Sequence, residues 1–257
     1  MTNNELKYYE NLKRKKFRDS EDLFLIEGIH LIEECLKSKY YSQSLKKLVV
    51  RNGFANDNFL KKIQTVPGNI EIAYLENNKF KRLSETVNTQ GIIGVVQKTS
   101  LKRKSKRKNL IVALDSINDP GNLGTIIRTC YWFDVDEILI SKQSAELFNS
   151  KVIRATQGAM FNMIINENQD LSKELNKLNT EGYQIYLADS NGKKLLSDLK
   201  FENINHVVFV FGNEAHGISK DLNKSKSFNS VRIKRNTDCE SLNVGVSVGI
   251  ILNSVRN

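Results

Sequence analysis

An unbroken apolar run from Val207 to Phe211 constrains the fold of this chain more than any other stretch. Five β-branched or aromatic residues that stop at a glycine are typical of a buried strand in a parallel sheet. The loop that follows places Glu214 between Gly212 and Gly217. In open parallel sheets, ligands bind just past the carboxyl ends of central strands. We therefore expect an α/β fold with a ligand site in the loop after Phe211.

Between residues 110 and 233 the chain alternates short apolar runs with helical patterns. This βαβ rhythm predicts a parallel sheet with right-handed crossovers. We expect strands at 110–114, 137–140, 161–165, 183–188, 207–211 and 230–233, and helices at 123–133, 146–156 and 171–178.

The first part of the chain also alternates, which predicts a small three-layer α/β domain. Residues 98–109 are polar and charged and lack an apolar pattern, as expected of a linker. We predict a first domain at 1–98, a basic linker at 99–108 and a second domain at 109–257. Within the first domain we expect an apolar run at 23–26, strands at 47–51, 70–74 and 91–97, and helices at 29–36, 59–64 and 79–87.

The pattern of the last segment is ambiguous. Val244, Val246 and Val248 alternate with a period of two, as in a strand. Ser241, Gly245 and Gly249 instead fall four apart, as on one face of a helix. Each interior glycine costs a helix about 1 kcal/mol relative to alanine, so a helix here needs a close neighbour to explain them.

The formal net charge of +10 is concentrated in the first part of the chain. Residues 1–108 carry 23 Lys and Arg against 12 Asp and Glu, whereas the remaining residues carry 16 against 17. Two runs contribute most, Lys13 to Lys16 and Lys102 to Lys108. A polyanionic partner explains the asymmetry as a whole, while the second run alone is equally consistent with a solvated linker.

Other features narrow the class of protein. No apolar run approaches the ~20 residues that span a bilayer, and the N-terminus is polar, so we expect a cytoplasmic protein without a membrane partner. Cys35, Cys130 and Cys239 lie far apart, which argues against a disulfide framework and against a zinc site. We expect no metal cofactor.

The loop after the expected strand 110–114 is rich in turn-forming residues. Asp119, Pro120 and Gly121 predict a tight turn, and Asn122 is expected to cap the helix that follows. No G-x-G-x-x-G follows this strand, so the sequence lacks a dinucleotide-binding fingerprint.

Three segments resemble the motifs of one enzyme family. Asp119 to Thr129, Gly212 to Ser219 and Glu240 to Val244 are similar, in that order, to the motifs of the SpoU/TrmH family of S-adenosylmethionine-dependent RNA 2′-O-ribose methyltransferases, of the SPOUT class. Phe24 to Gly28 and Gln90 to Val96 resemble the L30e-like substrate-binding domain common at the N-terminus of this family. The resemblance implies a C-terminal helix, a parallel sheet with a deep trefoil knot that holds the cofactor, and a homodimer.

The resemblance also implies roles for individual residues. Backbone groups at Gly212, Ile233 and Leu242 are implied to hold S-adenosylmethionine. We interpret Arg128 as a group that binds an RNA phosphate and stabilises the developing alkoxide, because a guanidinium with a pKa above 12 is a poor base. His216 is an alternative general base. The implied catalytic set comprises Asn122, Arg128, Glu214, Ser241 and Asn243.

The resemblance leaves the target open. We expect ribosomal RNA of the 23S type, because family members with an L30e-like domain often act on large-subunit rRNA, and tRNA is the alternative. Two further hypotheses are a non-catalytic RNA-binding or ribosome-assembly protein on the same fold and a SPOUT methyltransferase that modifies a base. The dimer is expected to form through the C-terminal domain, with Ser241, Gly245 and Gly249 as a candidate contact face.

Overall fold

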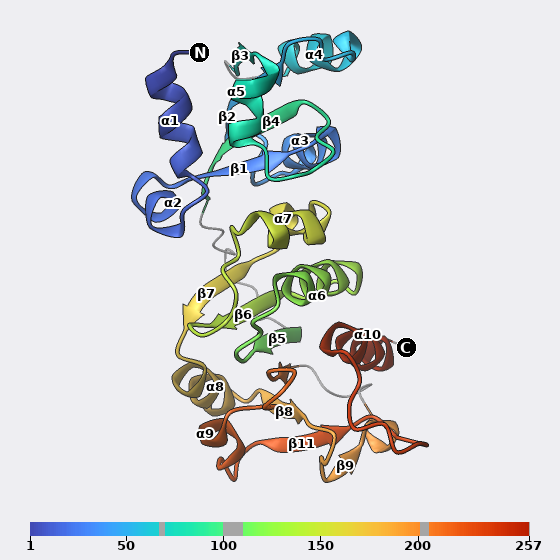
Figure 1. Cartoon of the computed structure of the whole chain (residues 1–257). Coiled ribbons are helices and arrows are strands. Elements are labelled where there is room, and N and C mark those ends of the chain that lie inside the picture. Colours follow the sequence, from blue (N-terminus) through green and yellow to red (C-terminus); the bar gives the residue numbers. More distant parts are fainter. Residues whose placement is uncertain (67–69, 100–109, 201–205, 257) are drawn as a thin grey trace. The chain divides into compact units, whose positions relative to one another are not determined.

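The computed structural model describes residues 1–66, 70–99, 110–200 and 206–256 (Figure 1). The chain divides into two compact units. One comprises Met1–Ser100 and Phe148–Asn162, and the other comprises Leu101–Leu147 and Met163–Asn257. The basic run from Lys102 to Lys108 lies outside the described residues.

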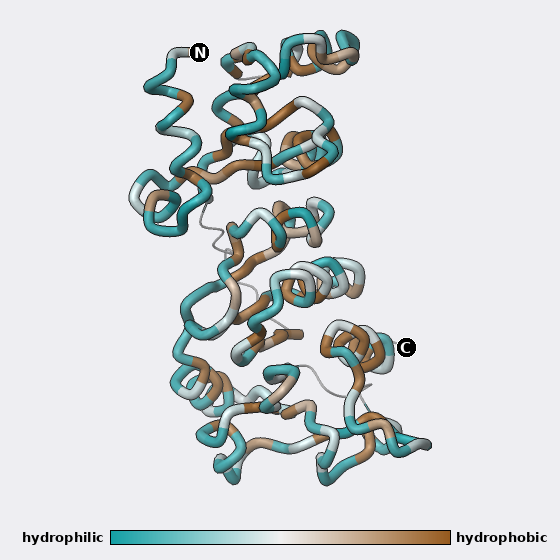
Figure 2. Tube along the Cα trace, in the orientation of Figure 1, coloured by the Kyte–Doolittle hydropathy of each residue, from teal (hydrophilic) through white to brown (hydrophobic). Residues whose placement is uncertain are grey.

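A mixed sheet forms the centre of the first unit. Its strands are β1 (Leu23–Glu27), β2 (Leu45–Arg51), β3 (Glu71–Leu75) and β4 (Ile92–Gln97), and their order is β1-β4-β2-β3. β4 runs antiparallel to β1 and β2, whereas β3 runs parallel to β2. Figure 2 draws β1 and β4 mainly as hydrophobic. The strands expected from the apolar runs of this region are confirmed.

Helices from both halves of the sequence pack in the first unit. Leu6, Phe80 and Leu83 contribute to a buried core with Val49 and Ile93 of the sheet. A hydrogen bond of 2.5 Å from Ser38 Oγ to the carbonyl of Phe161 joins the segment 148–162 to this unit. The helices are α1 (Asn3–Asn11), α2 (Lys15–Glu21), α3 (Ile29–Lys37), α4 (Asp57–Gln64), α5 (Asn77–Leu83), α7 (Ser150–Thr156) and the 3-10 helix η1 (Ala159–Asn162).

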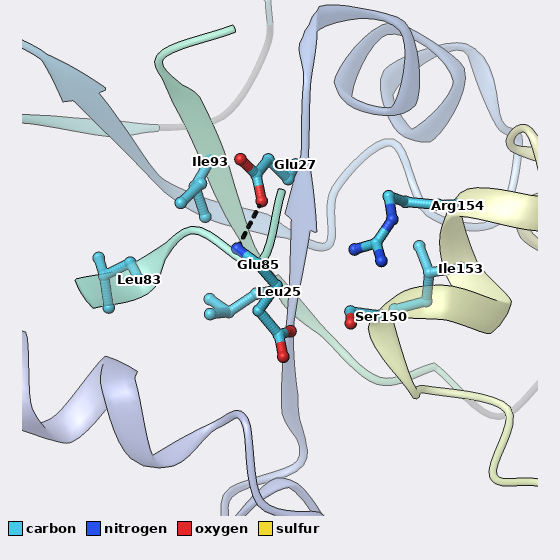
Figure 3. Close-up of a pocket in the computed structure, with 8 residues that line it drawn as sticks. All are labelled: Leu25, Glu27, Leu83, Glu85, Ile93, Ser150, Ile153 and Arg154. Carbon is cyan, nitrogen blue, oxygen red and sulfur yellow. Dashed lines mark hydrogen bonds between the residues drawn. The ribbon is translucent and has the colours of Figure 1, made fainter. Parts of the chain in front are cut away.

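The helix expected at 79–87 ends at Leu83, and the next residues form a loop held by Glu27. The Glu27 carboxylate accepts hydrogen bonds from the hydroxyls of Ser84 and Thr86, both at 2.6 Å. It also accepts one from Glu85 N at 3.0 Å (Figure 3). Burial raises the pKa of Glu27, but these hydrogen bonds outweigh that effect and the pKa lies below its usual value. Glu27 therefore anchors a loop.

The second unit is built on a parallel sheet. Within the described residues it contains β5 (Leu110–Leu114), β6 (Glu137–Ser141), β7 (Ile165–Gln169), β8 (Gln184–Ala188), β9 (Lys194–Leu195), β10 (Val207–Phe211) and β11 (Asn229–Arg232). The order is β7-β6-β5-β10-β8-β11-β9, and every pair of neighbours is parallel. The predicted parallel sheet is confirmed, and β10 lies near its middle between β5 and β8.

One strand was misplaced in the sequence prediction. The strand expected at 161–165 is wrong, because residues 159–162 form η1 and β7 begins at Ile165. Met160 and Phe161 supply the apolar signal, and both are buried in the first unit instead of on the large sheet. β7 itself is polar and only partly buried, as suits an edge strand.

Helices flank the large sheet on both sides. They are α6 (Pro120–Trp132), α8 (Leu171–Thr180), α9 (Lys220–Asn223) and α10 (Val244–Arg256), with the 3-10 helix η2 (Leu196–Asp198). In Figure 1, α8 and α9 lie on one side of the sheet and α6 and α10 on the other. The α8 and α9 side is closed by a core in which Leu175, Ile218 and Leu222 pack with strand residues such as Val208 and Val210.

The ambiguous C-terminal segment is the helix α10, and the position of α6 explains its glycines. A Cβ atom added at Gly245 would lie 3.3 Å from Thr125 Cγ2, and one added at Gly249 would lie 3.8 Å from Thr129 Cγ2. The glycines thus allow α10 to approach α6 closely. Gly245 and Gly249 therefore face α6 of the same chain, and the expected contact between subunits through Ser241, Gly245 and Gly249 stays a prediction.

In the part of the chain that the structure describes, no helix has the length and apolarity needed to cross a membrane. The same residues contain no cluster of His, Cys, Asp or Glu able to hold a metal ion.

Candidate active site

The start of α6 differs from the sequence prediction in a way that frees Asn122. The cap of this helix is Asp119, whose Oδ1 accepts a hydrogen bond of 2.7 Å from Asn122 N. Pro120 occupies the first helical position, where its missing N–H costs nothing. The expected capping role of Asn122 is therefore wrong, and its side chain is available for other contacts.

The Asn122 side chain connects all three sequence motifs. Its Nδ2 donates to Glu214 Oε1 at 2.8 Å, and its Oδ1 accepts from Asn243 Nδ2 at 2.9 Å. Because both ends of the amide are engaged, its orientation is fixed by the network. Asn243 also caps α10, since its Oδ1 accepts from Gly245 N at 2.9 Å. The structure thus brings together three of the five predicted catalytic residues.

The loop that carries Glu214 closes on itself. Asn213 N and Gly217 N each donate to the other residue's carbonyl at 2.9 Å. Asn213 Oδ1 accepts from Ala215 N at 2.9 Å and from His216 N at 3.0 Å. A Cβ atom at Gly212 would lie 2.3 Å from the carbonyl carbon of Gly217, so no larger residue fits. This closure holds Glu214 and His216 at the exposed tip of the loop.

Two anchoring residues of this loop escaped the sequence analysis. Asp115 is 5% exposed and its Oδ2 accepts from Ser219 N at 2.8 Å, while Asn213 Nδ2 donates to the carbonyl of Ser116 at 2.9 Å. These bonds tie the loop after β5 to the loop after β10, and Phe211 and Leu114 are paired at the ends of those strands. The available signal was an acid placed directly after a buried apolar run.

Arg128 and Ser241 lie apart from the cluster around Asn122. Arg128 is exposed on α6 and forms no hydrogen bond or ion pair with any described residue. It follows Asn122 by six residues, a rotation of about 240° around the helix, so the two side chains leave α6 on different faces. Ser241 is exposed, and its carbonyl accepts from Cys239 Sγ at 3.4 Å.

A cavity of about 760 Å³ opens beside the cluster, at the carboxyl ends of the central strands. Ala188 of β8, Phe211 of β10 and Val231 of β11 contribute to its base. The three residues predicted to bind the cofactor, Gly212, Ile233 and Leu242, all line it, as do Glu214, His216 and Ser241. Its volume falls in the range of ~300–1,000 Å³ typical of small-molecule sites.

Glu214 is the residue that belongs both to the cavity wall and to the cluster. Apolar side chains of Val244 and Ile251 face the same cavity, which suits the flat apolar surface of a nucleoside. The site therefore combines a mixed apolar and polar cavity with a fixed carboxylate at its rim.

The three motifs that form this site lie within the region that matches a known protein family. A family model described as the SpoU rRNA Methylase family matches residues 109–253. The chain belongs to the SpoU rRNA methylase family. A second model, described as an MRM3-like substrate binding domain, matches residues 3–94. The family and the N-terminal substrate-binding domain expected from the sequence are confirmed.

Relatives cover the chain from end to end. It is 29% identical to the 23S rRNA (guanosine(2553)-2′-O)-methyltransferase RlmP of Bacillus subtilis, over 99% of this chain and 96% of that protein. A putative RNA methyltransferase of the TrmH family from Porphyromonas gingivalis is 26% identical, with a TM-score of 0.85 over 100% of this chain and 98% of its own. An AdoMet-bound rRNA methyltransferase from Sinorhizobium meliloti is 25% identical, with a TM-score of 0.81 over 100% and 95%.

As a member of this family the chain is an RNA methyltransferase. Family membership replaces the hypothesis of a non-catalytic RNA-binding protein on the same fold. S-adenosylmethionine is bound in the related Sinorhizobium structure, and the cavity described above provides a site of suitable size and chemistry for it.

Proposed function

We propose that this SpoU-family enzyme transfers the methyl group of S-adenosylmethionine to a ribose 2′-hydroxyl of 23S-type ribosomal RNA. The main support is the Glu214–Asn122–Asn243 cluster at the rim of the 760 Å³ cavity. The Bacillus relative, similar over nearly its whole length, modifies a 2′-oxygen of 23S rRNA. In this proposal residues 1–98 bind RNA, residues 99–108 link the domains and residues 109–257 catalyse the transfer.

The cofactor is held by the walls of the cavity. Backbone groups of Gly212, Ile233 and Leu242 bind it, while Val244 and Ile251 supply apolar contact. When bound, S-adenosylmethionine supplies an electrophilic methyl group on a positively charged sulfur. Because that charge disappears during transfer, the protein's main task is to position the ribose oxygen in line with the methyl group.

The cluster positions that oxygen. Glu214 Oε1 is engaged by Asn122, and the second carboxylate oxygen has no hydrogen bond among the described residues. It is available to accept a hydrogen bond from the ribose hydroxyl. Arg128, exposed and unpaired among the described residues, binds an RNA phosphate and stabilises the developing alkoxide. Ser241 contacts the ligand from the cavity wall.

We also propose the SPOUT-type trefoil knot for the segment that lines the cavity. Residues 233–242 leave β11, pass along the cavity and enter α10. The SpoU methyltransferase AviRb of Streptomyces viridochromogenes has the same overall fold, with a TM-score of 0.86 over 99% of this chain and 97% of its own.

A homodimer through the second unit is part of the proposal. Four large apolar side chains are exposed on the adjacent helices α6 and α10: Tyr131 at 49%, Trp132 at 84%, Val246 at 51% and Ile250 at 37%. Such neighbouring apolar residues on a surface mark an interface between proteins. Light scattering should give twice the chain mass, and a monomer would contradict this part.

Transfer of labelled methyl groups to unmodified RNA, fractionated into rRNA and tRNA, tests the function. We expect label in the rRNA fraction and protection of one phosphodiester bond against alkaline hydrolysis, since only a 2′-O-methyl group gives that protection. Label in tRNA alone would correct the substrate. A labelled nucleotide without protection would indicate modification of a base and refute the ribose assignment.

A further inference from the structure

Four consecutive cations mark the passage from α1 to α2: Lys13 and Arg14 lie between the helices, and Lys15 and Lys16 are the first residues of α2. We call residues 13–16 the turn. Arg14 N donates to the carbonyl of Asn11 at 2.9 Å, and Lys13 N donates to that of Glu10 at 3.2 Å. Arg18 is 6% exposed, and its Nη1 donates to the carbonyl of Leu12 at 2.7 Å. The cations therefore stand on a fixed turn.

No acid among the described residues forms an ion pair with the cations of this turn. Arg14, Lys15 and Lys16 are exposed, and none of them forms an ion pair with a described residue. Lys13 Nζ donates to the carbonyl of Ser84 at 3.2 Å, a neutral partner that leaves its charge in place.

Two acids of the neighbouring segments already pair with other cations. Glu10 pairs with Arg82 at 2.5 Å, and Asp19 pairs with Lys98 at 2.6 Å. The Arg82 hydrogen bond is the main cause of a lowered pKa at Glu10, and the positive charges of Lys13 and Arg14 lower it further. Three cations thus act on the Glu10 carboxylate.

Two aromatic rings lie on the same two helices. The rings of Tyr8 and Phe17 meet edge to face with centroids 5.2 Å apart, and both side chains are only partly buried. Tyr8 donates to Glu21 at 2.5 Å, which raises the pKa of Tyr8 to about 12 and keeps the phenol neutral. Figure 2 draws both helices as mainly hydrophilic. A positively charged, hydrophilic surface with partly exposed aromatic rings is typical of proteins that bind nucleic acids.

We propose that this turn, residues 13–16, binds the phosphate backbone of the RNA substrate. The proposal rests on the function proposed above, since the turn falls within the residues that match the substrate-binding model. It adds a defined contact surface that holds the RNA without reading its sequence, because cations on a fixed turn recognise phosphate oxygens of any nucleotide.

The test is RNA binding by the full chain carrying Arg14→Gln, Lys15→Gln and Lys16→Gln together. A control variant with Lys173→Gln, Lys177→Gln and Lys220→Gln removes the same charge from exposed positions on α8 and α9. If three phosphate contacts are lost, the slope of log K against log salt should fall by about 2, and affinity at ~0.1 M salt should fall about 100-fold. The control should bind like the wild type.

Methyl transfer by the same proteins separates this proposal from the function. We expect the KM for RNA to rise in the triple variant while kcat and the KM for S-adenosylmethionine stay unchanged, with equal thermal melting. A wild-type salt slope in the triple variant, or the same loss in the control, would refute the turn as a phosphate site. Loss of RNA binding in the triple variant, with a wild type that methylates no RNA, would support the turn and refute the enzymatic proposal.

Discussion

Replacing Asn122 with aspartate tests the centre of the active-site cluster with almost no change in shape. The side-chain nitrogen that donates to Glu214 at 2.8 Å becomes an oxygen, so two carboxyl groups face each other. The bond from Asn243, at 2.9 Å, keeps its acceptor. Asn122→Asp therefore perturbs the Glu214 half of the cluster and leaves the Asn243 half in place.

The expected loss of catalytic efficiency in Asn122→Asp has two contributions, a lost hydrogen bond and a new repulsion between like charges. A hydrogen bond to a charged acceptor contributes about 1.5–3 kcal/mol, and two like charges some 4 Å apart in a water-like environment repel by about 1 kcal/mol. The aqueous value applies because Glu214 is exposed. A total of about 2.5–4 kcal/mol lowers kcat/KM by roughly 70-fold to 900-fold. Asn122 does not line the cavity, so the Kd for S-adenosylmethionine should stay within about 3-fold by calorimetry.

The pH dependence of the variant provides the decisive readout. Two adjacent carboxyl groups raise the pKa of the pair, so one proton binds as the pH falls and restores a hydrogen bond between them. The ratio of variant to wild-type methyl transfer should therefore rise as the pH is lowered from about 8 to 5. Asn122→Ala, which cannot bind this proton, should show a constant ratio. Equal pH profiles for the two variants, or full activity of Asn122→Asp at pH 8, would refute the role given to this contact.

Two further predictions concern stability. Gly245→Val should crowd α6 and lower the free energy of unfolding by about 1–3 kcal/mol. Gly249→Ala meets only ordinary contact distances, so it should raise the free energy of unfolding by about 1 kcal/mol. Thermal melting of the two variants measures both changes, and equal shifts in melting temperature would contradict the packing of α10 on α6. Hydrogen bonds from Thr2 and from the buried Lys47 lower the pKa of Glu5 to about 2, so the stability they provide is complete above pH ~4.5 and is lost as the pH falls toward 2. Lys47→Met should reduce this acid-dependent loss in melts recorded across that range, and an unchanged pH dependence would refute the assignment.

The central strands were predictable because buried strands appear in the sequence as unbroken apolar runs. β5 and β10 are uniformly apolar and buried throughout, as a central parallel strand must be. β7 was misplaced because an edge strand needs no apolar run, and the apolar residues before it, Met160 and Phe161, are buried in the first unit. α1 was missed because Leu6 is its one buried residue, and a single buried apolar side chain produces no helical periodicity in the sequence.

The site was predictable in part, and for a different reason. The resemblance supplied the residues, and parallel strands explain why the loops after β5 and β10 meet, since neighbouring parallel strands end at the same edge. No sequence pattern predicts that Asn122 forms hydrogen bonds with Glu214 and Asn243, which lie 92 and 121 positions further along the chain. The separation of Arg128 from Asn122 follows from helical geometry alone, because six residues do not complete a whole number of turns.

Glu214 explains why the loop around it is so tightly fixed. One end of its carboxylate is held by Asn122, outside the cavity lining, and the residue itself forms part of the cavity wall. A movement of the loop would therefore displace the wall that binds the cofactor and the group that positions the ribose oxygen at the same time. The two backbone bonds between Asn213 and Gly217, the absence of a side chain at Gly212 and the buried Asp115 all oppose that movement. Cofactor binding and ribose positioning thus depend on one rigid element, and Asp115, remote from the reaction, should influence both.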